Sequence, residues 1–159
     1  MKYFEPDFKF KNMESIDFDE LKNAGTKGII LDIDNTLVEP HTPVADDRAK
    51  MFVEKLKNAE FKICIVSNNI PQRAKKFADS LNLDWVCNGN KPSKKPFKLA
   101  LKILKEKPEH IAVVGDQIFT DVWGAKRMKM ISVLLDPICD KEGKFVKFKR
   151  KIEKIVVNR

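Results

Sequence analysis

Cysteine is scarce in this sequence, and long apolar runs are missing. The three cysteines, Cys64, Cys87 and Cys139, are an odd number and form no CxxC pair, which argues against a disulfide framework or a zinc site. No apolar run approaches the length of about 20 residues that a membrane-spanning helix needs. The opening segment MKYFEPDFKF mixes charges with aromatic residues, which is not the pattern of a secretory signal. We therefore expect a cytoplasmic protein with reduced thiols.

Positive charge, in contrast, is abundant and unevenly distributed. The formal net charge is +8. Residues 141–159 contain eight Lys or Arg against Glu142 and Glu153, a local net charge of +6. Such a segment can bind the phosphates of nucleic acid, bind lipid headgroups, or simply face solvent, and charge alone does not choose among these.

Strand-like and helix-like segments alternate along the chain. Short runs rich in Ile and Val, typical of strands, occur at 28–33, 61–66, 85–87, 111–114 and 131–135. Between them, apolar residues recur at i, i+3, i+4 and i+7 from Ala49, Ala74 and Phe97, the pattern of helices with one buried face. The alternation predicts an α/β fold, with a parallel sheet of about five strands in a three-layer Rossmann-like arrangement. At this length we expect one domain, residues 1–159.

Local signals suggest where the helices begin. Proline is tolerated in the first helical turn, and Ser, Thr, Asp or Asn often caps it. Candidate first-turn prolines are Pro43, Pro71 and Pro96, and candidate caps are Thr42 and Asn69. Residues 1–26 are expected to form an irregular extension packed on the domain, with a short helix over 17–21 that ends near Gly25.

Polar residues follow the predicted strands at their carboxyl ends, where ligands bind in parallel sheets. Asp32 and Asp34 alternate with Ile33, so both are expected to point the same way. Two close carboxylates repel each other unless a cation lies between them or one of them acts as an acid. A third carboxylate, Asp116, favours a cation. The residues expected at this rim are Asp32, Asp34, Thr36, Ser67, Asn68, Asn69, Asn88, Lys91, Gly115, Asp116 and Asp121.

These residue types point to phosphoryl chemistry. Oxygen ligands without a nearby His or Cys select a hard ion, so Mg²⁺ is the expected cofactor. The hydroxyl of Ser67, the amide groups around Asn68 at a helix N-terminus and the ammonium of Lys91 suit a phosphate opposite the metal. An aspartate beside that phosphate can attack it, and a carboxylate two residues further on can protonate the leaving oxygen and then activate water. Asp32 and Asp34 have this spacing.

Four motifs in this order resemble those of the haloacid dehalogenase-like (HAD) phosphatases: DIDNT, SNN, KP and GDQIFTD. Within that superfamily, GTKGIILDIDNTLVEP and VVGDQIFTDVWGAKRM resemble the YqeG-type group of subfamily IIIA, over about residues 3–157. That group is related to the mitochondrial phosphatidylglycerophosphate phosphatases. The resemblance implies an HAD fold and a Mg²⁺-dependent phosphomonoester hydrolase.

The resemblance also implies a role for each motif residue. It implies that Asp32 is the nucleophile that forms an aspartyl-phosphate, and that Asp34 is the general acid/base whose backbone carbonyl also reaches Mg²⁺. Phosphate is bound by Ser67, Asn68 and Lys91, the metal ligands are Asp32, Asp34 and Asp116, and the supporting residues are Thr36 and Asp121. Lys94 and Lys95 follow Lys91 closely, and Lys91 is preferred because Pro92 follows it and because of its distance from Phe97.

Two functions of other classes compete with this interpretation. A receiver-type signalling domain is also α/β with clustered aspartates, but its phosphoacceptor follows the third strand, where this chain has CNGNKP without a carboxylate. A nucleic-acid-binding module could use the basic tail, but the tail has no recognisable reading motif. We therefore expect no specific nucleic-acid partner. The sequence makes no prediction of oligomeric state.

The spacing between motifs leaves no room for a cap domain. About nine residues separate Asp34 from Pro43, and about two dozen separate Ser67 from Lys91. An uncapped site suits a macromolecular or lipid phosphate ester, and the resemblance implies phosphatidylglycerophosphate. A soluble nucleotide or sugar phosphate is the alternative.

The basic tail predicts an amphipathic helix over 141–159. Its apolar residues at helical spacing are Phe145, Phe148, Ile152, Ile155 and Val156. Two interpretations stay open: the apolar face packs on the domain while the lysines face solvent, or the helix lies on an anionic membrane and makes the enzyme peripheral to it.

Overall fold

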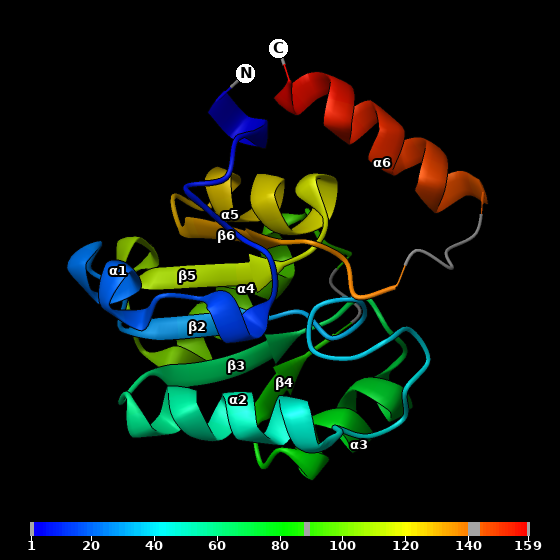
Figure 1. Cartoon of the computed structure of the whole chain (residues 1–159). Coiled ribbons are helices and arrows are strands. Elements are labelled where there is room, and N and C mark those ends of the chain that lie inside the picture. The colour runs from blue at the N-terminus through cyan, green and yellow to red at the C-terminus, as the bar shows by residue number, and fades with distance from the viewer. Residues whose placement is uncertain (1, 88–89, 140–143, 159) are drawn as a thin grey trace.

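The computed structural model describes residues 2–87, 90–139 and 144–158, with the backbone alone over 144–148. In these residues six parallel strands form one sheet in the spatial order β1-β6-β5-β2-β3-β4, and the arrows of β2, β3 and β5 point the same way in Figure 1. The strands are β1 (Phe8–Phe10), β2 (Gly28–Leu31), β3 (Lys62–Val66), β4 (Asp84–Val86), β5 (Ile111–Gly115) and β6 (Ile131–Leu135). The α-helices are α1 (Phe18–Asn23), α2 (Asp47–Asn58), α3 (Pro71–Ser80), α4 (Lys94–Leu104), α5 (Trp123–Arg127) and α6 (Lys144–Val157). Single turns are η1 (Lys2–Phe4), η2 (Met13–Ser15), η3 (Pro108–His110) and η4 (Ile118–Val122), the last of π type.

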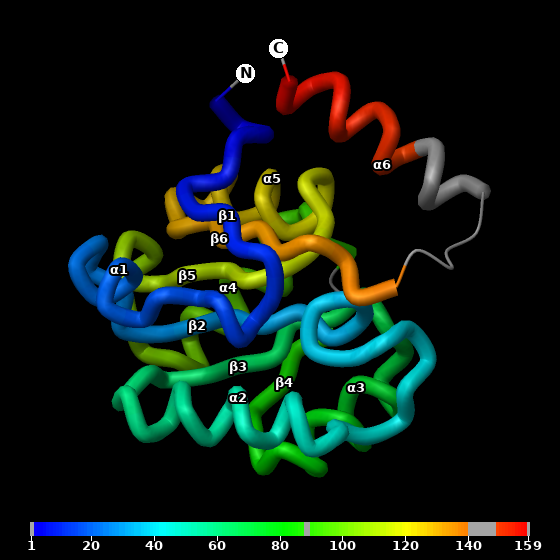
Figure 2. The backbone as a smooth tube through the Cα atoms, in the orientation of Figure 1, coloured from blue at the N-terminus to red at the C-terminus, as the bar shows by residue number. Residues whose placement is uncertain are grey.

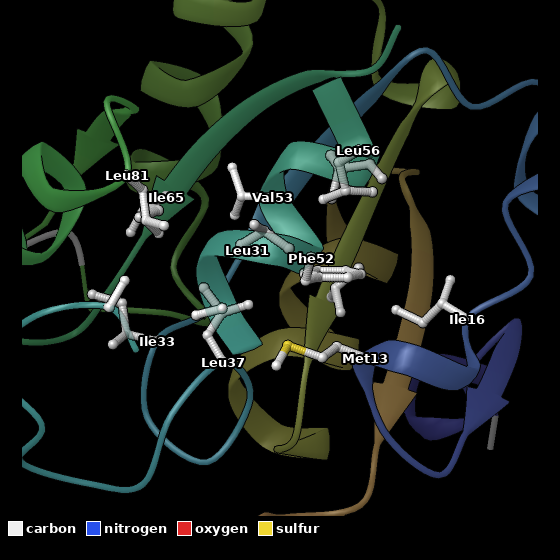
Figure 3. Packing of buried hydrophobic residues seen from close by; sticks show 14 of the residues in the cluster. Met13, Ile16, Leu31, Ile33, Leu37, Phe52, Val53, Leu56, Ile65 and Leu81 are labelled. Carbon is white, nitrogen blue, oxygen red and sulfur yellow. The ribbon is translucent and has the colours of Figure 1, made fainter. Parts of the chain in front are cut away.

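Two hydrophobic clusters cover the two faces of the sheet. Side chains alternate along a strand, so Ile29 and Leu31 of β2 join the cluster beneath α1, α2 and α3, while Ile30 between them joins the cluster beneath α4 and α5. Figure 3 shows part of the first cluster, where Phe52, Val53 and Leu56 of α2 lie close to Leu31. The three-layer α/β prediction is confirmed.

The sheet has one strand more than predicted. β1 comes from residues 1–26, which were expected to be irregular, and it pairs in parallel with β6 through Phe8↔Val133. A strand of three residues carries too little alternation to be recognised in the sequence. The helix predicted over 17–21 is confirmed as α1, where Asp17 is the cap and Gly25 takes a positive φ of 93° just beyond the end.

One of the predicted helix starts is wrong, and neither predicted cap, Thr42 or Asn69, caps its helix. Helix α2 begins four residues after Pro43, because Asp46 caps it by accepting from the amide of Ala49. Helix α3 does begin with Pro71, but the side chain of Asn69 does not cap it and bonds to Asp34 instead. Pro96 lies in the first turn of α4, as predicted.

The chain order creates a switch point between β2 and β5. From β2 the chain continues to β3 and β4 on one side, and later to β5 and β6 on the other side. Ligands of such sheets bind at the carboxyl ends of the strands, where the order reverses. Asp32 follows β2 and Asp116 follows β5, so these two carboxylates flank the switch point.

Helix α6 lies beyond β6, on the same side of the molecule as η1 (Figure 2). Val157 of α6 and Phe4 of η1 pack against a small cluster of Ile118, Val122 and Leu134. Ile152 and Ile155, however, are 38% and 52% exposed, so α6 does not bury all of its predicted apolar stripe on the domain. The side chains of Phe145 and Phe148 lie outside the described residues. Among the helices of the described ranges, none combines the length and the apolar character of a membrane span.

Candidate active site

Asp32 and Lys91 form the centre of the site. The ammonium of Lys91 donates to Oδ1 of Asp32 at 2.9 Å and to Oδ1 of Asp121 at 2.7 Å. The side chain of Lys91 is only 3% exposed, whereas Lys94 and Lys95 are exposed. Of the three candidate lysines, the structure brings Lys91 to the aspartates.

Asp116 lies on the other side of Asp32. The hydroxyl of Thr36 is 3.2 Å from Oδ1 of Asp116 and 3.4 Å from Oδ2 of Asp32, and so bridges the two carboxylates. Asn35 adopts a φ of 60°, a left-handed conformation that Asn tolerates better than most residues. The turn at Asn35 brings Thr36 back toward the end of β2.

Asp34 has different partners from Asp32. Arg73 of α3 binds its carboxylate with two hydrogen bonds, from Nη1 to Oδ2 at 3.0 Å and from Nη2 to Oδ1 at 2.7 Å. Nη2 of Arg73 also donates to the carbonyl of Thr42 at 2.9 Å. The side-chain amide of Asn69 donates to Oδ2 of Asp34 at 2.9 Å. Asp34 is therefore held from α3 and from the loop after β3.

Ser67 and Asn68 connect the site to the end of β3. The hydroxyl of Ser67 is buried and accepts from the backbone amide of Asn69 at 3.1 Å and from its side-chain amide at 2.7 Å. Asn68 bonds twice to the backbone of Lys91: its Oδ1 accepts from the amide at 2.8 Å, and its Nδ2 donates to the carbonyl at 3.2 Å. Asn68 thus fixes the segment that carries the ammonium.

The glycine that begins the GDQIFTD motif is required for a steric reason. Asp121 lies in the π-type turn η4, and its Oδ2 accepts from the amide of Gln117 at 3.2 Å. A Cβ at position 115 would lie 2.1 Å from this Oδ2. Only glycine at 115 lets the carboxylate of Asp121 approach the backbone while its other oxygen binds Lys91.

A second cation reaches the site from α6. The guanidinium of Arg150 forms an ion pair with Oδ2 of Asp116, and its Nη1 donates to the carbonyl of Asp116 at 3.2 Å. One turn further along, the buried Glu153 accepts from the amide of Phe119 at 3.2 Å. Helix α6 therefore contacts the loop that follows β5 through polar groups.

Burial dominates the electrostatics of the cluster. It raises the pKa of Asp32 to about 6, although the charge of Lys91 acts in the opposite direction. Burial, with Asp32 and Asp121 nearby, also raises the pKa of Asp116 above its ordinary value, and Arg150 opposes that rise. Burial alone would lower the pKa of Lys91, but Asp121 and Asp32 outweigh it and raise that pKa. Burial and the neighbouring carboxylates thus both disfavour the ionised forms of Asp32 and Asp116.

A divalent cation fits this donor set. Asp32, Asp116 and Asp121 each offer one carboxylate oxygen, and these oxygens lie within 4.8 Å of one another. Oxygen donors alone suit a hard ion such as Mg²⁺. Asp121 binds Lys91 through one oxygen and the amide of Gln117 through the other. Asp32 and Asp116 follow β2 and β5 at the switch point, where ligands of such sheets bind, and are the better placed ligands. The side chain of Asp34 is turned to Arg73 and Asn69, and its part in a metal site would fall to its backbone carbonyl.

Hydrogen bonds, ion pairs and close contacts connect nearly all the predicted site residues with one another. The exception is Asn88, which lies outside the described residues. Sequence reasoning missed Arg73 and Arg150. Arg73 carried a weak signal, since it lies in the first turn of a helix that starts at the rim. Arg150 is one of eight basic residues in the tail, and nothing in the sequence distinguishes it from its neighbours.

Comparison with known proteins finds similarity to phosphatases. The profile of a family described as mitochondrial PGP phosphatase matches residues 1–138. The probable phosphatase YqeG of Bacillus subtilis is 36% identical over 157 residues, covering 99% of this chain and 91% of that protein. Phosphatidylglycerophosphate phosphatase 1, chloroplastic/mitochondrial, of Arabidopsis thaliana is 27% identical over 154 residues, covering 89% of this chain and 43% of that protein.

A solved structure supports the same fold. The HAD-superfamily hydrolase of Ehrlichia chaffeensis superposes with a TM-score of 0.57 at 15% identity, covering 83% of this chain and 98% of that one. At this identity the likeness concerns the fold alone. The full-length relative and the family profile, by contrast, extend over the motifs that build the site. The chain belongs to the family described as mitochondrial PGP phosphatase, and it is a phosphatase, that is, a phosphoric monoester hydrolase, with the fold of an HAD-superfamily hydrolase.

Proposed function

We propose that the chain is a Mg²⁺-dependent phosphomonoesterase that works through an aspartyl-phosphate on Asp32. The observation that carries the proposal is the position of Asp32, partly buried at the switch point of the sheet between Lys91 and the Thr36–Asp116 pair. A nucleophile there is next to a fixed cation and to an oxygen donor set that suits a hard metal. Bound Mg²⁺ would supply positive charge to the phosphoryl oxygens and to Asp32.

The proposed reaction has two steps with balanced bonds. In the first, a carboxylate oxygen of Asp32 bonds to phosphorus, the ester P–O bond breaks, and its electron pair leaves on the alcohol oxygen, which takes a proton from Asp34. In the second, water bonds to phosphorus while Asp34 takes its proton, and the P–O bond to Asp32 breaks to release phosphate. Lys91, Ser67 and Asn68 would bind or position the phosphoryl group.

The position of Asp34 is fixed by α3 and by the loop after β3. Arg73 pairs with both of its oxygens, which gives the carboxyl group one defined orientation. Asn69 connects Asp34 to Ser67. We infer that Arg73 and Asn69 position the acid/base beside the leaving oxygen.

A covalent mechanism makes a direct test possible. Wild-type protein should release p-nitrophenol from p-nitrophenyl phosphate with Mg²⁺ and stop when EDTA is added. The activity of Asp32→Asn should be more than about a thousandfold lower than that of the wild type. Its unfolding midpoint should be unchanged, because Lys91 retains Asp121 as a partner. Near wild-type turnover in Asp32→Asn would exclude the covalent step. Slow self-phosphorylation without turnover in the wild type would instead indicate a receiver.

For the substrate we propose a lipid phosphomonoester, with phosphatidylglycerophosphate first. The description of the family and the name of the Arabidopsis relative support this choice. The described residues between Asp34 and α2, and between Ser67 and α4, form no separate folded unit over the site. The exposed Ile152, Ile155, Lys151 and Lys154 of α6 also suit an anionic lipid surface.

The substrate test compares phosphatidylglycerophosphate in mixed micelles with glycerol phosphate, sugar phosphates and nucleotides. The lipid should be hydrolysed fastest, and the protein should float with anionic liposomes at low salt but less at high salt. Changing Lys151 and Lys154 together to Gln should reduce flotation, whereas the same change at the exposed Lys94 and Lys95 should not. Equal or faster hydrolysis of the soluble esters, without flotation, would favour a phosphatase of soluble substrates.

A further inference from the structure

The guanidinium of Arg150 is paired with a carboxylate oxygen of Asp116. Asp116 is also a residue that the proposed metal would use as a ligand. The side chain of Asp116 is completely buried, and its Oδ2 is paired with Arg150 while its Oδ1 faces Thr36. Asp116 is one of the two best placed metal ligands of the cluster. A metal coordinated by that Oδ2 has to replace the ion pair, because one oxygen cannot serve both cations at full strength.

Helix α6, which carries Arg150, makes few contacts with the domain. Among the side chains described on α6, those at 149–158, Arg150 and Glu153 form hydrogen bonds with the domain, the ammonium of Lys149 lies 5.9 Å from the ring centroid of Phe119, and Val157 adds an apolar contact. A cavity of about 530 Å³ separates α6 from the edge of the sheet, lined among others by Asp116, Leu134, Arg150 and Val157. Segments with few buried apolar contacts open at low free-energy cost.

We propose that Arg150 is an internal counter-ion that a divalent cation displaces from Asp116, so that metal binding loosens α6 from the domain. In the metal-free enzyme Arg150 compensates Asp116 and holds α6 in place. In the metal-bound enzyme Asp116 is compensated by the metal, and α6 loses its contact with the site. Arg150 thereby sets the metal concentration at which the site fills.

The inference rests on the metal site of the proposed function, but it adds a coupling that the function does not require. Two ligands that compete for one group are linked reciprocally, so weakening one of them strengthens binding of the other by the same factor. Removing Arg150 should therefore tighten Mg²⁺ binding. A residue that merely supported the metal ligand would have the opposite effect when removed.

The test measures Mg²⁺ affinity and the motion of α6 without an activity assay. Calorimetric titration of the full chain with Mg²⁺ should give a dissociation constant about tenfold lower for Arg150→Gln than for the wild type, a typical size for a coupling between two sites. The matched control is Lys151→Gln, which removes the same charge from an exposed position on the same helix and should leave the affinity unchanged. Circular dichroism checks that both variants are folded.

Hydrogen exchange of the amides of α6 gives the second measurement. In the wild type, Mg²⁺ should speed exchange over 149–157. In Arg150→Gln exchange should already be fast, and Mg²⁺ should add little. Equal affinities in the wild type and Arg150→Gln, or Mg²⁺ that leaves exchange of wild-type α6 unchanged, would overturn the inference while the proposed metal site stands. If neither protein binds Mg²⁺, the metal site fails and the inference with it.

Discussion

Lys91 and Arg150 both bring a positive charge to the buried aspartates, but they reach them from different kinds of structure. Lys91 comes from the segment before α4, its backbone is bonded twice to Asn68, and its side chain is 3% exposed. Arg150 comes from a surface helix above a cavity, and its side chain is 16% exposed. A side-chain cation that the core holds in place stays beside the carboxylates. A side-chain cation on a loosely held helix can be displaced by a metal ion.

The same contrast applies to the carboxylates. Asp32 and Asp121 share Lys91 inside the domain, so a fixed cation lies beside them whether or not a metal is present. Asp116 depends on Arg150 or on a metal. The predictions below test whether the two cations differ in this way.

The largest effect is expected from Lys91→Met. Breaking a buried ion pair by removing one partner typically costs about 3–5 kcal/mol, because the remaining charges stay buried without compensation. Here two carboxylates would be left, and phosphatase activity should be lost as well. Denaturant unfolding measures the loss, with the exposed Lys95→Met as the control. If Arg150→Gln destabilised the protein as much as Lys91→Met, the contrast between the two cations would be wrong.

Asp116→Asn should chiefly weaken Mg²⁺ binding. A neutral amide is a poor ligand for a hard dication, so the Mg²⁺ concentration for half-maximal activity should rise by about tenfold or more. Exchange in α6 should also become faster without metal, because Arg150 loses its ion pair. The control is Asp136→Asn, an exposed carboxylate at the same edge of the sheet. An unchanged Mg²⁺ titration would remove Asp116 from the metal site.

Arg73→Gln should lower turnover without changing the affinity for Mg²⁺. Arg73 fixes the carboxylate of Asp34 with two hydrogen bonds, and a misplaced acid/base typically costs about tenfold or more in rate. The loss should appear in kcat rather than in KM, and it should alter the pH profile of kcat. Lys76→Gln, an exposed change on the same helix, should have neither effect. A rise in KM alone would indicate that Arg73 binds substrate instead.

The sequence predicted the parts of the fold that follow from periodicity and strand order. The five strands between 28 and 135 and the buried faces of α2, α3 and α4 are found as expected, because alternating apolar patterns leave few ways to bury a core. β1 was missed because a pair of phenylalanines around Lys9 is too short a pattern. The start of α2 was misplaced because a local proline signal was preferred to the cap at Asp46.

In the site, the residues close to one another in a motif were easier to predict than the contacts between motifs. Asp32, Lys91, Asp116 and Asp121 come from three separate segments, and parallel topology alone brings their strand ends together. The partners of Asp34 depend on the direction of a side chain on α3. The contact of Arg150 depends on where a terminal helix docks, which no periodicity in the sequence determines.

The smallest effect is expected at Glu153, the second polar contact of α6. Burial raises the pKa of its carboxyl above the ordinary value of 4.5. The folded state therefore keeps a proton that the unfolded state has already lost, so the stability of the wild type falls as the pH rises from about 4.5 through the folded pKa. Below that window both states are protonated and the group costs nothing.

Glu153→Gln should remove this pH dependence, because an amide cannot ionise but its oxygen can still accept from the amide of Phe119. In EDTA at pH 8 the variant should be slightly more stable than the wild type, by less than about 1 kcal/mol because neighbouring cations and solvent screen the charge. At pH 4 the two unfolding midpoints should coincide. The exposed Glu109→Gln should show no such difference. A variant that is less stable at pH 8 would mean that the ionised Glu153 holds α6 more firmly than the neutral group does, and the helix would then be anchored at Phe119 rather than at Asp116.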